Sequence, residues 1–363
     1  MKLTLRIKIK PNEQQRILLI QTIKEANRAC SYISNIAWES KVFAKYGLHG
    51  LCYDDVRKRF KLSSQMVVRC IGKVADAYKL DQNKRREFKL YGSISYDSRI
   101  LSYRENEVSI WTINKRQKIP FVCHNEGFLG LQKGEADLVF RNGKFFLHQT
   151  IDVQEGEIEE TNKTIGLDFG VVDMVCTSDG NTYSHDFLKK NYRKKRANIR
   201  SSIQSKGTRG CRKLLKRLNG REKTTATIIN HTISKRIVGN AKENKACLAI
   251  ENLKNIRKSG YNKSHRFREL VNTWSFNQLR KFISYKCKLA GVPLVVVNPS
   301  YTSQTCSICH HVGKRNGKSF RCPNCGNKVD ADINAAINIA QLGDAINHPE
   351  KSEMYSCSLQ HSI

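Results

Sequence analysis

Acidic residues are scarce in this chain of 363 residues, which has 32 Asp and Glu against 64 Lys and Arg and a formal net charge of +32. Such a chain repels itself unless an anionic partner neutralises it, and the usual polyanion is nucleic acid. Charge alone leaves a ribosome-like binder and a membrane-surface protein open as alternatives. With 39% hydrophobic and 26% charged residues the chain is expected to fold, and its length indicates two or three structural units.

Long apolar runs are also missing. No stretch of about 18 apolar residues occurs, so no transmembrane helix is expected. Residues 1–10 alternate basic with apolar side chains and lack the apolar core of a signal peptide, which predicts a β-strand. Internal repeats are absent as well. Nine of the 13 cysteines are scattered singly, mostly among apolar neighbours, which predicts buried thiols in a reducing cytoplasm.

The first half of the chain predicts a helical unit placed inside a β unit. Apolar residues at three- and four-residue spacing predict a long helix after Pro11, and a second helix over 63–79 presents Gln65, Arg69 and Lys73 on one polar face. Residues 11–90 are therefore expected to form a helical unit. From 91 to 157 the period becomes two, and Asn142-Gly143 suits a tight hairpin turn. The strand 1–10 is expected to join this sheet.

The second half predicts a mixed α/β sheet. A buried strand over 164–170 contains one acid and is followed by a meander that turns at 178–181. Helices and strands then alternate, and this order is typical of a mixed sheet. The expected elements are a helix over 222–244, a strand over 246–251, a helix over 274–290, a strand over 293–298 and a helix from about 332.

Positive charge is concentrated in residues 189–223, which hold 15 Lys or Arg and one acid, Glu222. A charge run is usually a solvated face. Because this segment adjoins the predicted α/β sheet, which is a candidate for catalysis, a nucleic-acid contact is the favoured interpretation. Residues that could make this contact include Lys194, Lys195, Arg196 and Arg200. The tail after about residue 344 has no periodic pattern and is expected to be disordered.

Four clustered cysteines form the strongest local motif. Cys306-x-x-Cys309 and Cys322-x-x-Cys325 are separated by twelve residues, so four thiolates can converge tetrahedrally on one Zn²⁺. Because this ligand set is closed, the predicted metal is structural. A redox-active dithiol is the alternative, and His310 or His311, which follow Cys309, are possible substitute ligands.

Three acids are singled out by their context. Asp168 stands inside an apolar strand, Glu251 ends the strand that begins at Ala246, and Asp332 opens the last helix. If they meet at one edge of the sheet, their repulsion calls for a divalent cation, and oxygen ligands suit Mg²⁺ or Mn²⁺. Two such ions about 4 Å apart can hydrolyse a phosphodiester. The simpler alternatives are a helix N-cap for Asp332 or for Asp330 and a strand-end ion pair for Glu251.

These motifs resemble those of the TnpB family, the transposon-encoded, RNA-guided DNA endonucleases related to compact type V CRISPR effectors. The segments that resemble its three RuvC motifs are 166–170 (GLDFG), 250–253 (IENL) and 330–336 (DADINAA). The segment 301–309 (YTSQTCSIC) resembles the entry to its zinc ribbon, and Trp274-Ser275-Phe276-x-x-Leu279 resembles the helix before it. The match is specific over 160–340 and diffuse over 1–157. His310 departs from the family, which usually has Gly after the second cysteine.

The resemblance implies a multidomain α+β and α/β protein with an RNase H-like RuvC domain and an inserted four-cysteine zinc ribbon. Asp168, Glu251 and Asp332 fall on the family's magnesium-binding acids, and the four cysteines fall on its zinc ligands. The implied domains are a β wedge-like domain (1–10 and 91–157), a helical recognition domain (11–90), the RuvC domain (158–299 and 329–345), the zinc ribbon (300–328) and a disordered tail (346–363).

The resemblance also implies partners: a guide RNA of the omega type and double-stranded target DNA, in a prokaryotic cytoplasm and with no membrane. Base pairing would read the target, while the protein reads a short flanking motif. Rough alignment places that reading at Tyr53, Ser64, Gln65 and Arg69, although ordinary solvent-facing roles explain these residues equally well. The alternatives are a transposase or transposase-accessory protein, an RNA-guided DNA-binding repressor without nuclease activity, and a compact type V CRISPR effector.

Overall fold

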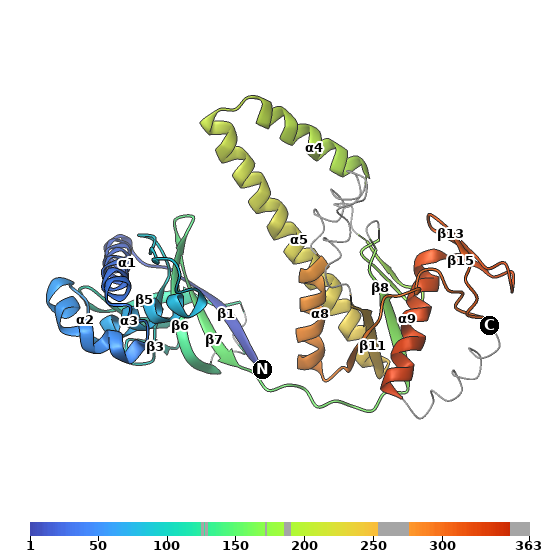
Figure 1. Ribbon diagram of the computed structural model, residues 1–363, viewed down its shortest axis with the longest axis horizontal. Coiled ribbons are helices and arrows are strands. Elements are labelled where there is room, and N and C mark those ends of the chain that lie inside the picture. Colours follow the sequence, from blue (N-terminus) through green and yellow to red (C-terminus); the bar gives the residue numbers. More distant parts are fainter. Residues whose placement is uncertain (125–126, 128–129, 171–172, 185–189, 253–275, 349–363) are drawn as a thin grey trace. The chain divides into compact units, whose positions relative to one another are not determined.

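The computed structural model describes residues 1–124, 127, 130–170, 173–184, 190–252 and 276–348. It divides into two compact units, Met1–Gln154 and Glu155–Ile363 (Figure 1). Leu253, Trp274 and Ser275 of the motifs quoted above lie outside the described residues, as does the chain after His348. Across the described residues, no helix combines the length and the apolar character needed to cross a membrane. The cysteines in this part of the chain carry free thiols, and most of them are buried.

The first unit contains a seven-stranded antiparallel sheet in the order β2-β6-β7-β1-β5-β4-β3. Its opening strand pairs with β7 along its whole length and with β5 at one end, so the expectation that residues 1–10 join this sheet is confirmed. Asn142 and Gly143 turn the β6–β7 hairpin with φ of 51° and 76°, as the sequence predicted. The strands are β1 (Lys2–Ile9), β2 (Ile94–Tyr96), β3 (Leu101–Arg104), β4 (Glu107–Thr112), β5 (Lys115–Val122), β6 (Gln132–Arg141) and β7 (Lys144–Asp152).

Three helices lie between β1 and β2: α1 (Glu13–Ser40), α2 (Lys45–Arg59) and α3 (Ser64–Leu80). A capping box starts α1, because Asn12 accepts from the Gln15 backbone N–H and the Gln15 side chain accepts from the Asn12 N–H. Helices α1 and α3 were predicted, whereas α2 was not. The four-residue spacing of its buried residues Leu48, Cys52 and Val56 was its only apolar signal.

The second unit is built on a five-stranded sheet in the order β10-β9-β8-β11-β12. Strand β11 lies between β8 and β12 and is parallel to both, while β9 and β10 are antiparallel, as the predicted meander requires. The strands are β8 (Lys163–Asp168), β9 (Val175–Thr177), β10 (Thr182–Tyr183), β11 (Ala246–Glu251) and β12 (Leu294–Val297), and the small sheet after them contains β13 (Lys314–Asn316), β14 (Ser319–Arg321) and β15 (Lys328–Asp330).

Helices cover both faces of the five-stranded sheet, with α5 (Arg209–Glu243) and α8 (Phe276–Ala290) on one side and α9 (Ala331–Asn347) on the other (Figure 1). Alternation along the strands decides which residue faces which helix. Ile165, Leu167, Leu248 and Ile250 belong to the apolar core with α5 and α8, whereas Ala249 packs in the group that contains Ile339 of α9.

Glycine allows α9 to lie very close to the sheet. A Cβ atom on Gly166 of β8 would stand 2.0 Å from the carbonyl oxygen of Ala336, and a Cβ on Gly343 of α9 would stand 2.4 Å from the Cβ of Ala249. Any side chain at either position would push the helix away from the strands. The first glycine of the GLDFG segment therefore sets the depth at which α9, and with it Asp332, meets the strand that carries Asp168.

The basic segment forms a helical hairpin of α4 (Lys190–Ser205) and α5. Helix α5 has 35 residues and begins at Arg209, well before the predicted start at residue 222. The prediction was too short because the exposed first half of this helix has few apolar residues to set a period. Its buried residues begin at Ile229, where the helix reaches the sheet. At the other end of the unit, α9 continues to Asn347, two residues past the expected limit of 345.

Candidate active site and metal centre

Two acids lie at the carboxyl ends of neighbouring parallel strands. Asp168 is the last residue of β8 and Glu251 is the last residue of β11, and the residues just before them, Leu167 and Ile250, are paired across the two strands. Since Leu167 and Ile250 face α5 and α8, alternation turns both acids toward the face that α9 covers. The carboxyl edge of parallel strands is where α/β sheets commonly bind ligands.

The third acid, Asp332, is brought to the same edge by α9. Asp330 is the N-cap of this helix, since its Oδ1 accepts from the backbone N–H of Asp332 at 2.9 Å and of Ile333 at 3.3 Å. The N-cap alternative is therefore wrong for Asp332 and correct for Asp330. Asp332 is 7% exposed, and its Oδ1 accepts a hydrogen bond of 2.7 Å from Arg315 of β13.

The three predicted acids lie near enough to one another for their charges to interact. Burial raises the pKa of Asp168 to about 7, and the negative charges of Glu251 and Asp332 add to the shift, while Arg315 opposes it. Burial also raises the pKa of Glu251, and a hydrogen bond from Thr302 opposes that shift. The donors of all three acids are carboxylate oxygens, the ligands that a hard divalent cation such as Mg²⁺ or Mn²⁺ prefers. The carboxylates of Asp168, Glu251 and Asp332 are not all within 4.8 Å of one another in the described residues.

A fourth acid lies beside Asp332 and was missed from the sequence. Asp173 is 9% exposed and forms an ion pair with Lys318, and its carboxylate, the Cys176 thiol and the Asp332 carboxylate lie within 4.8 Å of one another. The sequence does mark Asp173, because it is a single acid among the apolar residues of 171–175, and the same kind of context singled out Asp168. Arg315 and Lys318, which contact the acids, had no signal among 64 basic residues.

The raised pKa of Asp168 predicts a pH-dependent stability. Between its unfolded pKa near 3.8 and its folded value of about 7, the folded chain keeps a proton that the unfolded chain loses, so stability falls as pH rises through this window. Asp168→Asn is therefore expected to raise the melting temperature of the magnesium-free protein at pH 8 and to change it little at pH 4. Melting curves without chelator, which leave any zinc in place, measure the effect. An equal change at both pH values would contradict the assignment.

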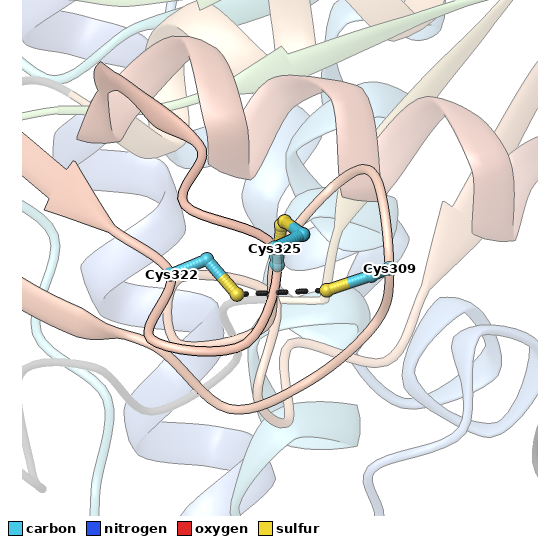
Figure 2. Close-up of side chains that lie close together, drawn as sticks. Cys309, Cys322 and Cys325 are labelled. Atoms are coloured by element: carbon cyan, nitrogen blue, oxygen red, sulfur yellow. Dashed lines mark hydrogen bonds between the residues drawn. The ribbon is translucent and has the colours of Figure 1, made fainter.

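The four clustered cysteines converge as their spacing predicted. Their sulfur atoms lie within 4.8 Å of one another, with Cys306 to Cys325 at 3.6 Å and Cys309 to Cys322 at 3.5 Å. Figure 2 shows the sulfurs of Cys309 and Cys322 facing each other, with Cys325 beside them. These separations are close to the edge of a ZnS₄ tetrahedron, about 3.8 Å for Zn–S bonds of about 2.3 Å. The residues therefore fit one Zn²⁺ ion.

The backbone of the first cysteine knuckle favours a thiolate at Cys309. The backbone N–H of His311 lowers the pKa of Cys309 to about 6. His310 has φ of 58°, in the left-handed region, and Gly326 occupies the corresponding place after Cys325 with φ of 74°. This conformation explains the preference for glycine from which His310 departs. Among the described residues, the metal-ligand cluster contains the four cysteines and neither histidine.

The residues predicted to read a flanking motif lie on α2 and α3 of the first unit. Tyr53 stacks on His49 with ring centroids 4.5 Å apart, and Ser64 is exposed at the start of α3. Gln65 donates to Asp97, and Arg69 forms an ion pair with Glu135. The shared polar face of α3 thus contacts side chains of its own unit, and its reading of DNA stays a prediction.

The predicted nucleic-acid contacts on α4 divide into two pairs. Lys194 and Lys195 are exposed, whereas Arg196 and Arg200 both form ion pairs with Glu222 of α5. The one acid of the basic segment therefore joins the two helices of the hairpin. Because the two arginines are paired with Glu222, the two lysines are better placed to bind a polyanion.

Comparison with known proteins first defines the class of fold. The Cas12f1-like, TNB domain model matches residues 276–339, which include the cysteine cluster. The solved structure of the mini-RNA-guided endonuclease CRISPR-Cas_phi3 is similar to the chain with a TM-score of 0.59 and 10% identity, over 94% of this chain and 92% of that one. The chain therefore has the mixed α/β fold of Cas12-type effectors.

Sequence comparison then defines the family. The TnpB-like protein MJ0751 of Methanocaldococcus jannaschii is 33% identical over 220 residues, which are 59% of this chain and 77% of the relative. The CRISPR-associated endodeoxyribonuclease Cas12f1 of Sulfoacidibacillus thermotolerans is 31% identical over 55% of this chain, and the chain spans half of that longer relative. The chain belongs to the TnpB-like family, as the sequence motifs indicated.

Proposed function

We propose that this protein is an RNA-guided endonuclease that cleaves double-stranded DNA next to a short flanking motif. The observation that carries the proposal is that Asp168 and Glu251 end neighbouring parallel strands, with Asp332 of α9 near enough to interact with the Asp168 charge, in a member of the TnpB-like family. A relative is named as a putative RNA-guided DNA endonuclease, InsQ of Escherichia coli, and is 28% identical over 56% of this chain.

The acidic site is proposed to be a RuvC nuclease site in an RNase H-like domain. Asp168, Glu251 and Asp332 would hold Mg²⁺ or Mn²⁺ through carboxylate oxygens, and Asp173 lies close enough to Asp332 to take part. When bound, the metal supplies activation of water and stabilisation of the leaving oxygen in phosphodiester hydrolysis. Burial of Glu251 and Asp332 keeps bulk water from screening their charges and so concentrates negative potential at this edge.

Nucleic acid would be held by the excess of positive charge. A guide RNA and a guide–target duplex present phosphates at every nucleotide, and Lys and Arg bind them without reading sequence. The exposed lysines of α4, Lys194 and Lys195, belong to a hairpin whose other helix, α5, packs against the nuclease sheet. Tyr53, Ser64, Gln65 and Arg69 are proposed to read the flanking motif, which requires Gln65 and Arg69 to exchange their partners Asp97 and Glu135 for base edges.

The test is plasmid cleavage by protein purified together with its own RNA. We expect RNA to copurify, and we expect a plasmid with the matching target and flanking motif to be cut only when Mg²⁺ is present. Protein stripped of RNA, and a plasmid with a scrambled target, are the controls. Cutting that ignores the RNA, joined strands instead of cuts, or RNA-dependent binding without any cut would each contradict the proposal, and the last two would favour a transposase or a repressor.

A further inference from the structure

Thr302, which precedes the cysteine cluster, contacts the candidate active site directly. The residue is 4% exposed, and its hydroxyl donates to Oε1 of Glu251 at 2.5 Å. The carbonyl oxygen of Pro299 lies 3.2 Å from the same hydroxyl. A hydroxyl has one proton, and the shorter bond to a charged carboxylate is the stronger of the two. The Thr302 hydroxyl therefore donates its proton to the Glu251 carboxylate rather than to the Pro299 carbonyl oxygen.

Two asparagines of α9 hold the backbone on which Thr302 stands. The side-chain amide of Asn338 donates to the carbonyl oxygens of Thr302 at 2.8 Å and of Thr305 at 2.7 Å. Asn334 donates to the Thr305 carbonyl at 2.7 Å, and its own Oδ1 accepts from the Ser307 N–H at 3.0 Å. Both asparagines are buried, so these bonds are shielded from water. The loop 302–307 is thereby fixed to the helix that carries Asp332.

We propose that Thr302 is a positioning residue of the metal site, which fixes one oxygen of the Glu251 carboxylate and so aims the other oxygen at a divalent cation. The inference rests on the proposed function, because it takes Glu251 to be a metal ligand. Partners that orient a metal ligand commonly affect metal affinity about 10- to 100-fold. Thr302 acts through Glu251 without touching the metal, and the loop from Thr302 to Cys306 joins the acidic site to the cysteine cluster.

The experiment measures Mn²⁺ binding to the RNA-free protein by electron paramagnetic resonance of the unbound ion, with Asp168→Ala as the blank. Thr302→Val keeps the shape and removes the hydroxyl, and we expect it to weaken the Asp168-dependent Mn²⁺ site about 10- to 100-fold. Thr302→Ser restores the donor and is expected to restore binding. Thr305→Val is the matched control, because that hydroxyl donates to the Tyr301 carbonyl oxygen, at 3.0 Å, and has no hydrogen bond to an acid among the described residues.

A cleavage titration gives the second readout. In Thr302→Val the Mg²⁺ concentration that gives half of the maximal rate is expected to rise by the same factor, while the rate at saturating Mg²⁺ stays close to that of the wild type. Melting temperature and zinc content are measured first, and Thr302→Ala replaces the valine variant if that variant does not fold. Failure of both variants to fold would show that Thr302 maintains the loop alone, and would overturn the proposal.

The outcomes separate this inference from the proposed function. If the wild type has no Mn²⁺ site that depends on Asp168, the proposed function fails. If that site exists and Thr302→Val binds Mn²⁺ as tightly as Thr305→Val does, the acids keep their assignment and the positioning role of Thr302 is overturned.

Discussion

Asp168→Asn is expected to lower the rate of RNA-dependent plasmid cleavage by about 10³-fold or more, although the same variant is expected to be more stable than the wild type without magnesium. Metal ions in such sites supply several kcal/mol of transition-state stabilisation, and each 1.36 kcal/mol is a factor of about ten in rate. The amide has the shape of the carboxylate and lacks its charge. It therefore weakens the metal site. It also removes the cost of burying a charge and the repulsion with Glu251 and Asp332, which together raise the pKa of Asp168.

Opposite signs for stability and activity make this result specific. A variant that is inactive because it unfolds melts earlier, whereas Asp168→Asn is expected to melt later at pH 8 and still fail to cut. Gel-shift measurements with the guide RNA and the target DNA are expected to match the wild type, because one neutralised acid leaves the phosphate contacts intact. Glu160→Ala, which removes an exposed acid from the same unit, is the control. Wild-type cleavage by Asp168→Asn would contradict the assignment of the active site.

Asp168, Glu251 and Asp332 could be selected as candidates because each is marked by its local context, whereas the ion-pair partners of the acids depend on the fold. An acid at the end of an apolar strand is visible in a single sequence, and so is a pair of CxxC knuckles. Arg315 reaches Asp332 only because the small sheet β13-β14-β15 returns the chain to the start of α9. No spacing rule selects that arginine from the other basic residues of the chain.

Two further differences have physical causes that sequence patterns hide. Asp330 and Asp332 both suit an N-cap, and the structure assigns that role to Asp330, which frees Asp332 for the acidic site. Gln65 and Arg69 lie on one helix face as predicted, but a pattern that shows a shared face does not show what covers it. Here Gln65 contacts Asp97, 32 positions later in the chain, and Arg69 contacts Glu135, 66 positions later.

Loss of the cysteine cluster is expected to have the largest effect on stability. Cys306→Ser together with Cys309→Ser should unfold residues 306–330, because the three strands there have three residues each and their shared core contains two of the cysteines, Phe320 and Ala331. Structural zinc contributes about 10–16 kcal/mol in small domains of this kind. Hydrogen exchange over 306–330 is expected to become fast, and zinc content should fall to zero. Cys211→Ser, on α5 and outside the cluster, is the control.

This unfolding should also disable the acidic site, because two of its contacts come from the cysteine-bearing segment. Arg315 belongs to β13 and holds Asp332, while the loop from Thr302 leads directly into Cys306 and holds Glu251. The double cysteine variant is therefore expected to lose Mn²⁺ binding and cleavage together, whereas the five-stranded sheet keeps its slow hydrogen exchange through the core with α5 and α8. Slow exchange retained over 306–330 would contradict a structural zinc ion. Fast exchange there with normal Mn²⁺ binding would show that the acids are positioned by α9 and the sheet alone.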